Sequence, residues 1–384
     1  MFDTNESRLD PEFIFQRQIS VSGGHSVQIE EETMRVLALD GGGARGLLQA
    51  RLLVQVEQAL NTGIGSSRRL PIGMFFDFVV GTSVGGLVAL AISAGKSAEE
   101  IRAYIDDCLN DVFARPRSRL GRWFTAKYRQ ESLLRSAKTF FGEATLAELG
   151  RASGKFPHAC VVALNTENRR TRLLKTGYSQ HLLELASTTK VYDAALATSA
   201  APTYFPAARI TLNKARTTLV DGGLVANNPS LIAVLEASKI LSGSHDELFP
   251  EGVAKHLPDI ALISVGTCRP PTNGKGANPK EGLAWWALHF HELTLDAQAQ
   301  HAEYFVHRLM PSNNYVRIDP RLEKEVELDD IAGVTSVLGT TNLEGELETK
   351  MKAWARADWP AYQFPSTADL ANGKRGNVVA WSAE

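Results

Sequence analysis

The stretch DFVVGTSVGGLVAL, residues 77–90, decides the fold that this sequence predicts. An apolar run meets Gly81-Thr82-Ser83-Val84-Gly85 and continues into small and apolar residues, which predicts a strand, a sharp turn and a helix. Glycine on either side of the turn lets the strand and the helix approach each other closely. Ser83 would then stand at a helix N-terminus, where free N–H groups favour developing negative charge. The spacing predicts a nucleophile elbow, and an ordinary Gly/Ser turn is the alternative.

A second glycine-rich turn lies upstream, where 35–39, a run typical of a buried strand, precedes Gly-Gly-Gly-Ala-Arg-Gly at 41–46 and a helical pattern follows over 47–60. Gly41, Gly43 and Gly46 fit a dinucleotide-binding spacing, but that motif needs an acidic residue about 20 positions on. Positions 61–73 contain no acid, and no Lys-Ser/Thr pair closes the loop as a phosphate-binding loop requires. The remaining interpretations are an oxyanion hole made of glycine N–H groups, and a glycine turn without a catalytic role.

Composition and charge narrow the class of protein. The chain has 384 residues, of which 44% are hydrophobic and 22% charged, as in a soluble globular protein of one large or two modest domains. We expect one catalytic domain with additions. With 41 basic and 43 acidic residues the formal net charge is −2, so we expect no nucleic-acid partner. Three widely spaced cysteines favour a reducing cytoplasm over a disulfide framework or a zinc site. No signal peptide or membrane-spanning run is predicted.

A local basic stretch interrupts this balance between residues 115 and 129. It holds no acid, and aromatic residues accompany its basic side chains. A lipid surface or an anionic ligand would use such a stretch, and a solvated basic loop is the alternative. The basic residues are Arg115, Arg117, Arg119, Arg122, Lys127 and Arg129.

Downstream, the segment Thr-Thr-Leu-Val at 217–220 ends in Asp221-Gly222-Gly223. An acid at the carboxyl end of a strand is where α/β folds place catalytic groups, whereas Asp-Gly is also a common turn pair. Residues 281–310 form a long helical pattern, and 343–357 form a last one.

Four segments together resemble the patatin-like phospholipases. In that family's order they are the glycine loop 41–46, the elbow 81–85, the segment Ala-Thr-Ser-Ala-Ala-Pro-Thr-Tyr-Phe-Pro at 197–206, and 221–223. The resemblance covers roughly residues 34–235 and implies an α/β fold: a three-layer α/β/α domain with a largely parallel central sheet. We expect an N-terminal arm over 1–33, the phospholipase domain over 34–360 and a C-terminal tail over 361–384.

The resemblance implies hydrolysis of fatty acyl esters of membrane phospholipids by a Ser–Asp dyad. Ser83 would be the nucleophile and Asp221 the base, with Gly41, Gly42 and Gly43 as the oxyanion hole. We expect an apolar pocket to raise the basicity of Asp221. The dyad needs no metal, and we expect no cofactor. The supporting motif positions are Arg45, Gly46, Gly81, Gly85, Gly222 and Gly223.

Two alternatives stay open at the site itself. A histidine could complete a Ser–Asp–His triad, since several follow Asp221 in the chain. Arg45 could pair with a structural carboxylate, Asp40 or another, or steer an anionic head group. The histidines that follow are His245, His256, His289, His291, His301 and His307.

The length and the polar arm are also similar to those of bacterial phospholipases that cyclic nucleotides activate in anti-phage signalling. This implies a cytoplasmic protein that reaches the inner membrane as a peripheral protein when a cyclic di- or trinucleotide switches it on. Assembly as a homo-oligomer stays open. The rival functions are a ligand-sensing or storage protein with little turnover, and an esterase or thioesterase that acts on other substrates.

Overall fold

A computed structural model describes residues 33–65, 69–118, 125–150, 156–242, 250–271, 282–340, 342–356, 361–363 and 377–379. All of them belong to one compact unit, Glu32–Glu384. The predicted N-terminal arm lies outside the described residues except for its last position, Thr33.

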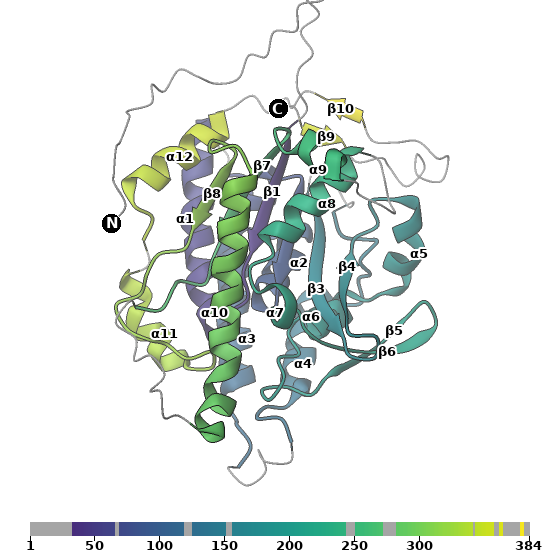
Figure 1. Ribbon diagram of the computed structural model, residues 1–384, viewed down its shortest axis with the longest axis vertical. Helices are drawn as coiled ribbons and strands as arrows, with labels where there is room; N and C mark the ends of the chain where they lie inside the picture. The colour runs from purple at the N-terminus through teal and green to yellow at the C-terminus, as the bar shows by residue number, and fades with distance from the viewer. Residues whose placement is uncertain are drawn as a thin grey trace, which may run out of the picture. The chain divides into compact units, whose positions relative to one another are not determined.

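Strands and helices are interspersed along the described chain, with runs of two or three helices between some of the strands (Figure 1). The strands are β1 (Met34–Leu39), β2 (Phe78–Thr82), β3 (His158–Asn165), β4 (Arg170–Lys175), β5 (Ala208–Leu212), β6 (Ala215–Asp221), β7 (Ile260–Val265), β8 (Tyr315–Ile318), β9 (Ala361–Gln363) and β10 (Asn377–Val379). The α-helices are α1 (Gly46–Ile64), α2 (Val84–Ser93), α3 (Ala98–Phe113), α4 (Gln130–Phe141), α5 (Gln180–Thr188), α6 (Val191–Thr198), α7 (Gly223–Ala226), α8 (Ser230–Ser242), α9 (Pro250–His256), α10 (Leu283–Leu309), α11 (Ile331–Val337) and α12 (Gly345–Arg356). Short 3₁₀ turns are η1 (Gly43–Arg45), η2 (Ile72–Phe75) and η4 (Leu338–Thr340).

One sheet of eight strands forms the centre of the described fold, in the order β5-β6-β3-β2-β1-β7-β8 with β4 also paired to β3. The pairs from β3 through β2, β1 and β7 to β8 are all parallel. The pairs β3–β4, β3–β6 and β5–β6 are antiparallel. The prediction of a largely parallel central sheet is therefore confirmed.

Both faces of this sheet are buried, which explains why β1 is apolar at every position except Arg35. Val36 and Ala38 belong to the core cluster that includes residues of α8, whereas Leu37 and Leu39 belong to the cluster that includes residues of α1 and α2. Figure 1 shows α8 and α10 in front of the sheet and α1 behind it. The α/β/α layering follows from this alternation.

The register brings the carboxyl ends of neighbouring strands to one edge. Leu39, the last residue of β1, is paired with Gly81 of β2 and with Val265, the last residue of β7. Parallel strands of an α/β sheet place their functional loops at this edge. The glycine loop after β1 and the elbow after β2 therefore lie side by side.

The segment predicted as a C-terminal tail contains described residues only at 361–363 and 377–379, where β9 and β10 pair antiparallel. Among the described helices, none is both long enough and apolar enough to cross a membrane.

Candidate active site

The elbow has the geometry that its glycine spacing predicts. Ser83 has φ 55° and ψ −126°, a strained conformation for a residue with a side chain, between the end of β2 and the start of α2. A Cβ at Gly81 would lie 2.2 Å from the carbonyl oxygen of Gly85, and a Cβ at Gly85 would lie 2.5 Å from that of Leu39. Only glycine at both positions allows strand and helix to pack this closely.

Ser83 and Asp221 are brought together although 138 positions separate them in the chain. The Ser83 hydroxyl donates a hydrogen bond to Asp221 Oδ2 at 2.6 Å. The N–H of Gly223 donates to the other carboxylate oxygen at 2.7 Å, so the carboxylate is held from both sides. A Cβ at Gly222 would lie 2.3 Å from the carbonyl oxygen of Val162, so the turn after β6 needs glycine there. This arrangement can pass a proton from the hydroxyl to the carboxylate.

Asp221 is a better base than an ordinary aspartate. Its side chain is buried, and burial raises its pKa from 3.8 to about 6 because the charged form loses solvation, while the hydrogen bonds from Ser83 and Gly223 oppose the shift. Near neutral pH the group is still mostly ionised and can accept a proton. The surroundings of Asp221 thus raise its basicity, which is the direction expected from the sequence.

The glycine loop lies against the elbow, but its three glycines differ. The N–H of Gly41 donates to the carbonyl oxygen of Asn227 at 2.9 Å, so it is not free to bind an oxyanion. Gly42 and Gly43 line the same cavity as Ser83. Gly43 has φ +54°, and a Cβ there would lie 2.2 Å from the carbonyl oxygen of Leu328. Gly41 is therefore poorly placed to donate to an oxyanion, and Gly42 and Gly43 stay the candidates of the predicted donor set.

A mostly apolar cavity opens above the hydroxyl–carboxylate pair. Ser83, Asp221 and the glycine loop form its polar part, and apolar side chains from α2, α3, α4 and α10 surround the remainder. A fatty acyl chain fits such a lining because burying it removes apolar surface from water. The apolar side chains are Leu87, Leu109, Val112, Phe113, Leu133, Phe205, Leu295 and Leu328.

The segment 197–206 holds the elbow in place. The Thr198 hydroxyl accepts a hydrogen bond from the N–H of Ser83 at 3.0 Å and donates one to the carbonyl oxygen of Val162 at 2.6 Å. The carbonyl oxygen of Ala200 accepts from the N–H of Asp221 at 3.0 Å. One segment therefore fixes the backbone of both members of the pair, a role that its small-residue sequence does not reveal.

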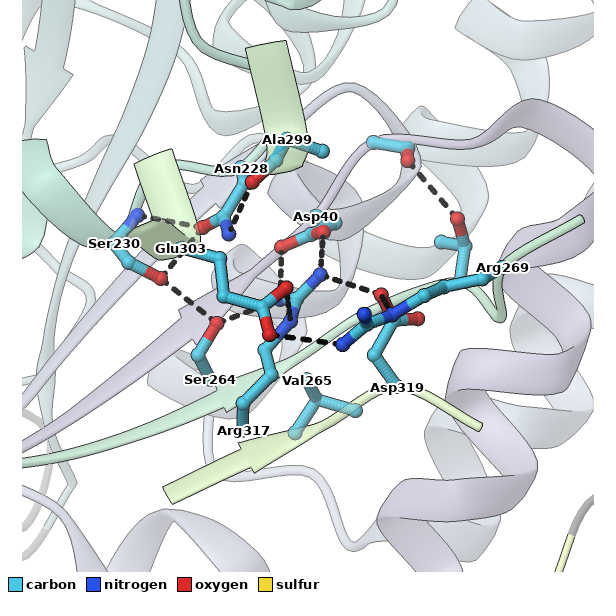
Figure 2. A network of polar contacts seen from close by, with 12 residues as sticks. Asp40, Asn228, Ser230, Ser264, Val265, Arg269, Ala299, Glu303, Arg317 and Asp319 are labelled. Carbon is cyan, nitrogen blue, oxygen red and sulfur yellow. Dashed lines mark hydrogen bonds and ion pairs between the residues drawn. The ribbon is translucent and has the colours of Figure 1, made fainter. Parts of the chain in front are cut away.

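Arg45 is buried and pairs with Asp296 of α10, at 3.7 Å between NH2 and Oδ1. Asp40 has a different partner, Arg317 of β8, whose two terminal nitrogens bind the two carboxylate oxygens at 2.8 and 2.5 Å (Figure 2). Arg45 thus pairs with a structural carboxylate, one of the two interpretations offered for it, and the partner is Asp296 and not Asp40.

The basic stretch is only partly described, since Arg119 and Arg122 lie outside the described residues. Lys127 forms an ion pair with Asp329, which also accepts a hydrogen bond from the Tyr128 hydroxyl at 2.5 Å. Arg117 is half-buried, and Arg115 and Arg129 are exposed. Lys127 thus takes part in an ion pair within the fold, whereas the side chains of Arg115 and Arg129 are exposed to solvent.

No histidine is among the described residues that line the cavity. His245 and the side chains of His289 and His291 lie outside the described residues. His256 contacts Asp259 at 3.0 Å, and His301 is exposed with its ring tilted by 52° against that of Phe305. Exposed His307 lies edge-on to Tyr315.

Comparison with known proteins agrees with this geometry. The sequence matches the family described as patatin-like phospholipase over residues 37–234. It is 32% identical over 314 residues to a protein of Pseudomonas aeruginosa named cGAMP-activated phospholipase, covering 81% of this chain and 85% of the relative. A protein of the same name from Vibrio cholerae is 31% identical over 360 residues, covering 86% of this chain and 96% of the relative.

The crystal structure of VipD from Legionella pneumophila aligns with a TM-score of 0.36 at 13% identity, covering 81% of this chain and 67% of VipD. With its elbow, glycine loop and Asp-Gly-Gly turn in one site, this chain belongs to the patatin-like phospholipase family.

Proposed function

We propose that the protein is a serine lipid acyl hydrolase that cleaves fatty acyl esters of membrane phospholipids through Ser83 and Asp221. The observation that carries the proposal is the 2.6 Å hydrogen bond from the Ser83 hydroxyl to a buried carboxylate at the edge of an apolar cavity. Family membership and the names of the bacterial relatives support the phospholipase class.

The geometry defines the proposed steps. As the Ser83 oxygen attacks the ester carbonyl, Asp221 takes its proton. The oxyanion forms near the N–H groups of Gly42 and Gly43 in the glycine loop, and the N-terminal end of α2, which begins after Ser83, also favours its charge. When the ester bond breaks, Asp221 returns the proton to the departing lysophospholipid oxygen. A water molecule, deprotonated by the same carboxylate, then hydrolyses the acyl-serine and releases the fatty acid.

The direct experiment follows fatty-acid release from phospholipid liposomes by the purified chain, with soluble acyl esters and acyl thioesters as parallel substrates. We expect release from liposomes, with slower turnover of the soluble substrates, because the cavity accommodates a long acyl chain. Turnover of thioesters alone would favour a thioesterase. Absence of turnover on every substrate, with or without an added cyclic di- or trinucleotide, would favour a storage or ligand-sensing protein.

We further propose that a cyclic di- or trinucleotide switches the enzyme on, as the names of the P. aeruginosa and V. cholerae relatives say of those proteins. A phospholipase in the cytoplasm has to be restrained, since its substrate is the membrane of its own cell. In the active state it would bind the inner membrane peripherally, with exposed Arg115 and Arg129 facing anionic lipid. Such a switch suits the anti-phage role that the sequence resemblance implies.

The rate should depend on pH through Asp221, which must be ionised to accept a proton. Because the pKa of this buried group is about 6, we expect kcat/KM to be level above about pH 7 and to fall about tenfold per unit well below pH 6. Initial rates on a soluble ester between pH 4.5 and 8.5 measure this, with the unfolding temperature checked at each pH. A rate that stays level down to pH 4.5 would contradict the assignment of the base.

A further inference from the structure

A second cavity lies at the carboxyl ends of β1, β7 and β8, beside the glycine loop. Asp40 and Arg45, which flank the loop, both contribute to its wall. Its charged side chains, some of which Figure 2 shows, number four arginines and four acids among the described residues. They are Arg45, Arg269, Arg317, Arg321, Asp40, Asp296, Glu303 and Asp319.

Several polar atoms in this wall are unsatisfied. Arg45 is 7% exposed, and its Nε has no hydrogen-bond partner among the described residues. The nearest acidic group, Asp296, is 3.7 Å from its NH2, which is too long for a hydrogen bond. Asp319 Oδ1 is also buried without a described partner. Because unpaired buried polar atoms are costly, the cavity is suited to a ligand that brings both acceptors and donors.

The mixture of charges selects the chemistry of that ligand. Arg269 and Arg317 already pair with Glu303, Asp319 and Asp40, so Arg45 is the arginine that most lacks a close partner. A simple anion on Arg45 would leave the carboxylates of Asp296 and Glu303 facing a negative charge. A purine nucleotide carries phosphate oxygens that match a guanidinium fork and amino or imino N–H groups that match a carboxylate. It supplies both kinds of partner at once.

We propose that this cavity binds a nucleotide, with a phosphate on Arg45 and the donor edge of a purine on Asp296 and Glu303 of α10, and that it is the activator site. That the bound nucleotide is an activator rests on the proposed function, whereas the binding of a nucleotide in this cavity does not.

The cavity is directly connected to the glycine loop. The N–H of Arg45 donates to the carbonyl oxygen of Gly42 at 3.0 Å, and the hydroxyl of Thr267 donates to that of Gly41 at 3.1 Å. On α10, Leu295 lines the acyl cavity and its neighbour Asp296 lines the second one. A phosphate that replaces Asp296 as the partner of Arg45 would therefore act on the N–H groups that face the oxyanion. A ligand acts as a switch only if it binds more tightly to one position of the glycine loop than to another.

The test measures binding of cyclic GMP–AMP to the purified full chain by calorimetry, separately from hydrolysis. We expect Arg45→Lys and Glu303→Gln each to weaken binding by about tenfold to about a hundredfold, because each loses a charge-assisted or bidentate contact. Arg321→Ala, at an exposed position of the same wall, provides a cavity variant with little risk to folding. Arg115→Ala and Arg129→Ala are the matched controls in the basic stretch, with affinity expected within about twofold of the unaltered protein.

The outcomes separate the two proposals. Inorganic phosphate alone should bind far more weakly than the dinucleotide, and Ser83→Ala should bind the dinucleotide normally. Binding without fatty-acid release would overturn the proposed function and leave the site. Affinity that is lost in the basic-stretch variants and unchanged in all three folded cavity variants would overturn the site. The site is also overturned if no cyclic di- or trinucleotide binds.

Discussion

Replacing Ser83 by alanine is expected to abolish fatty-acid release, with a loss of at least about 10⁴-fold in rate on liposomes. The hydroxyl is the only group at the elbow that donates to Asp221 in the described structure, so nothing replaces it as the nucleophile. The fold should survive, because the backbone turn depends on Gly81 and Gly85 and alanine keeps the Cβ of serine. Liposome hydrolysis and thermal unfolding, measured side by side, test both statements.

Ser93→Ala is the matched control, at the other end of α2. Its hydroxyl is buried and donates to the carbonyl oxygen of Pro157 at 2.7 Å, so the change removes one hydrogen bond without touching the cavity. We expect a small loss of stability and nearly unchanged turnover. Normal turnover by a folded Ser83→Ala protein would remove Ser83 from the mechanism.

Asp221→Asn should cost at least about 10³-fold in rate, since an amide cannot take the proton from Ser83. The same change should preserve or raise the stability of the folded protein. The folded-state pKa of Asp221 is raised to about 6, so folding favours the protonated form, and stability is lost as pH rises through that value. A neutral amide avoids this loss, and we expect the variant to unfold at the same or a higher temperature at pH 7.5.

Asp193→Asn provides the comparison, because burial also raises the pKa of this carboxyl and it does not line the cavity. It should keep its activity. Single changes of His256 and His301 to glutamine should also cost little. A histidine variant that folds normally and is as inactive as Ser83→Ala would convert the proposed dyad into a triad.

Local patterns predicted the parts of the site that local geometry determines. The glycines at 81 and 85 are required by close backbone approach, and the apolar run of β1 by burial on both faces, so both could be read from neighbouring residues. The hydrogen bond from Gly41 to Asn227 could not, because it depends on how the turn after α7 lies against the loop.

Ion-pair partners were the least predictable part. Arg45 could be expected to find a carboxylate, but the choice of Asp296 depends on where α10 crosses the sheet edge. Lys127 belongs to a basic stretch in the sequence, yet a distant acid, Asp329, pairs with it. Charge composition predicts that such ion pairs form. It cannot identify the partners, because they come together only in the folded chain.

The pairing of Asp40 with Arg317 also has a consequence for when the enzyme becomes active during synthesis. The two residues are 277 positions apart, twice the separation of Ser83 and Asp221. A nascent chain that already contains the nucleophile and its base still lacks the cation that neutralises Asp40 at the start of the glycine loop. Contacts this distant in sequence form late, and a buried carboxylate without its partner disfavours the native loop until then. We therefore expect hydrolytic activity to appear only after the sheet is complete, so that a partly made chain should not act on a membrane beside it.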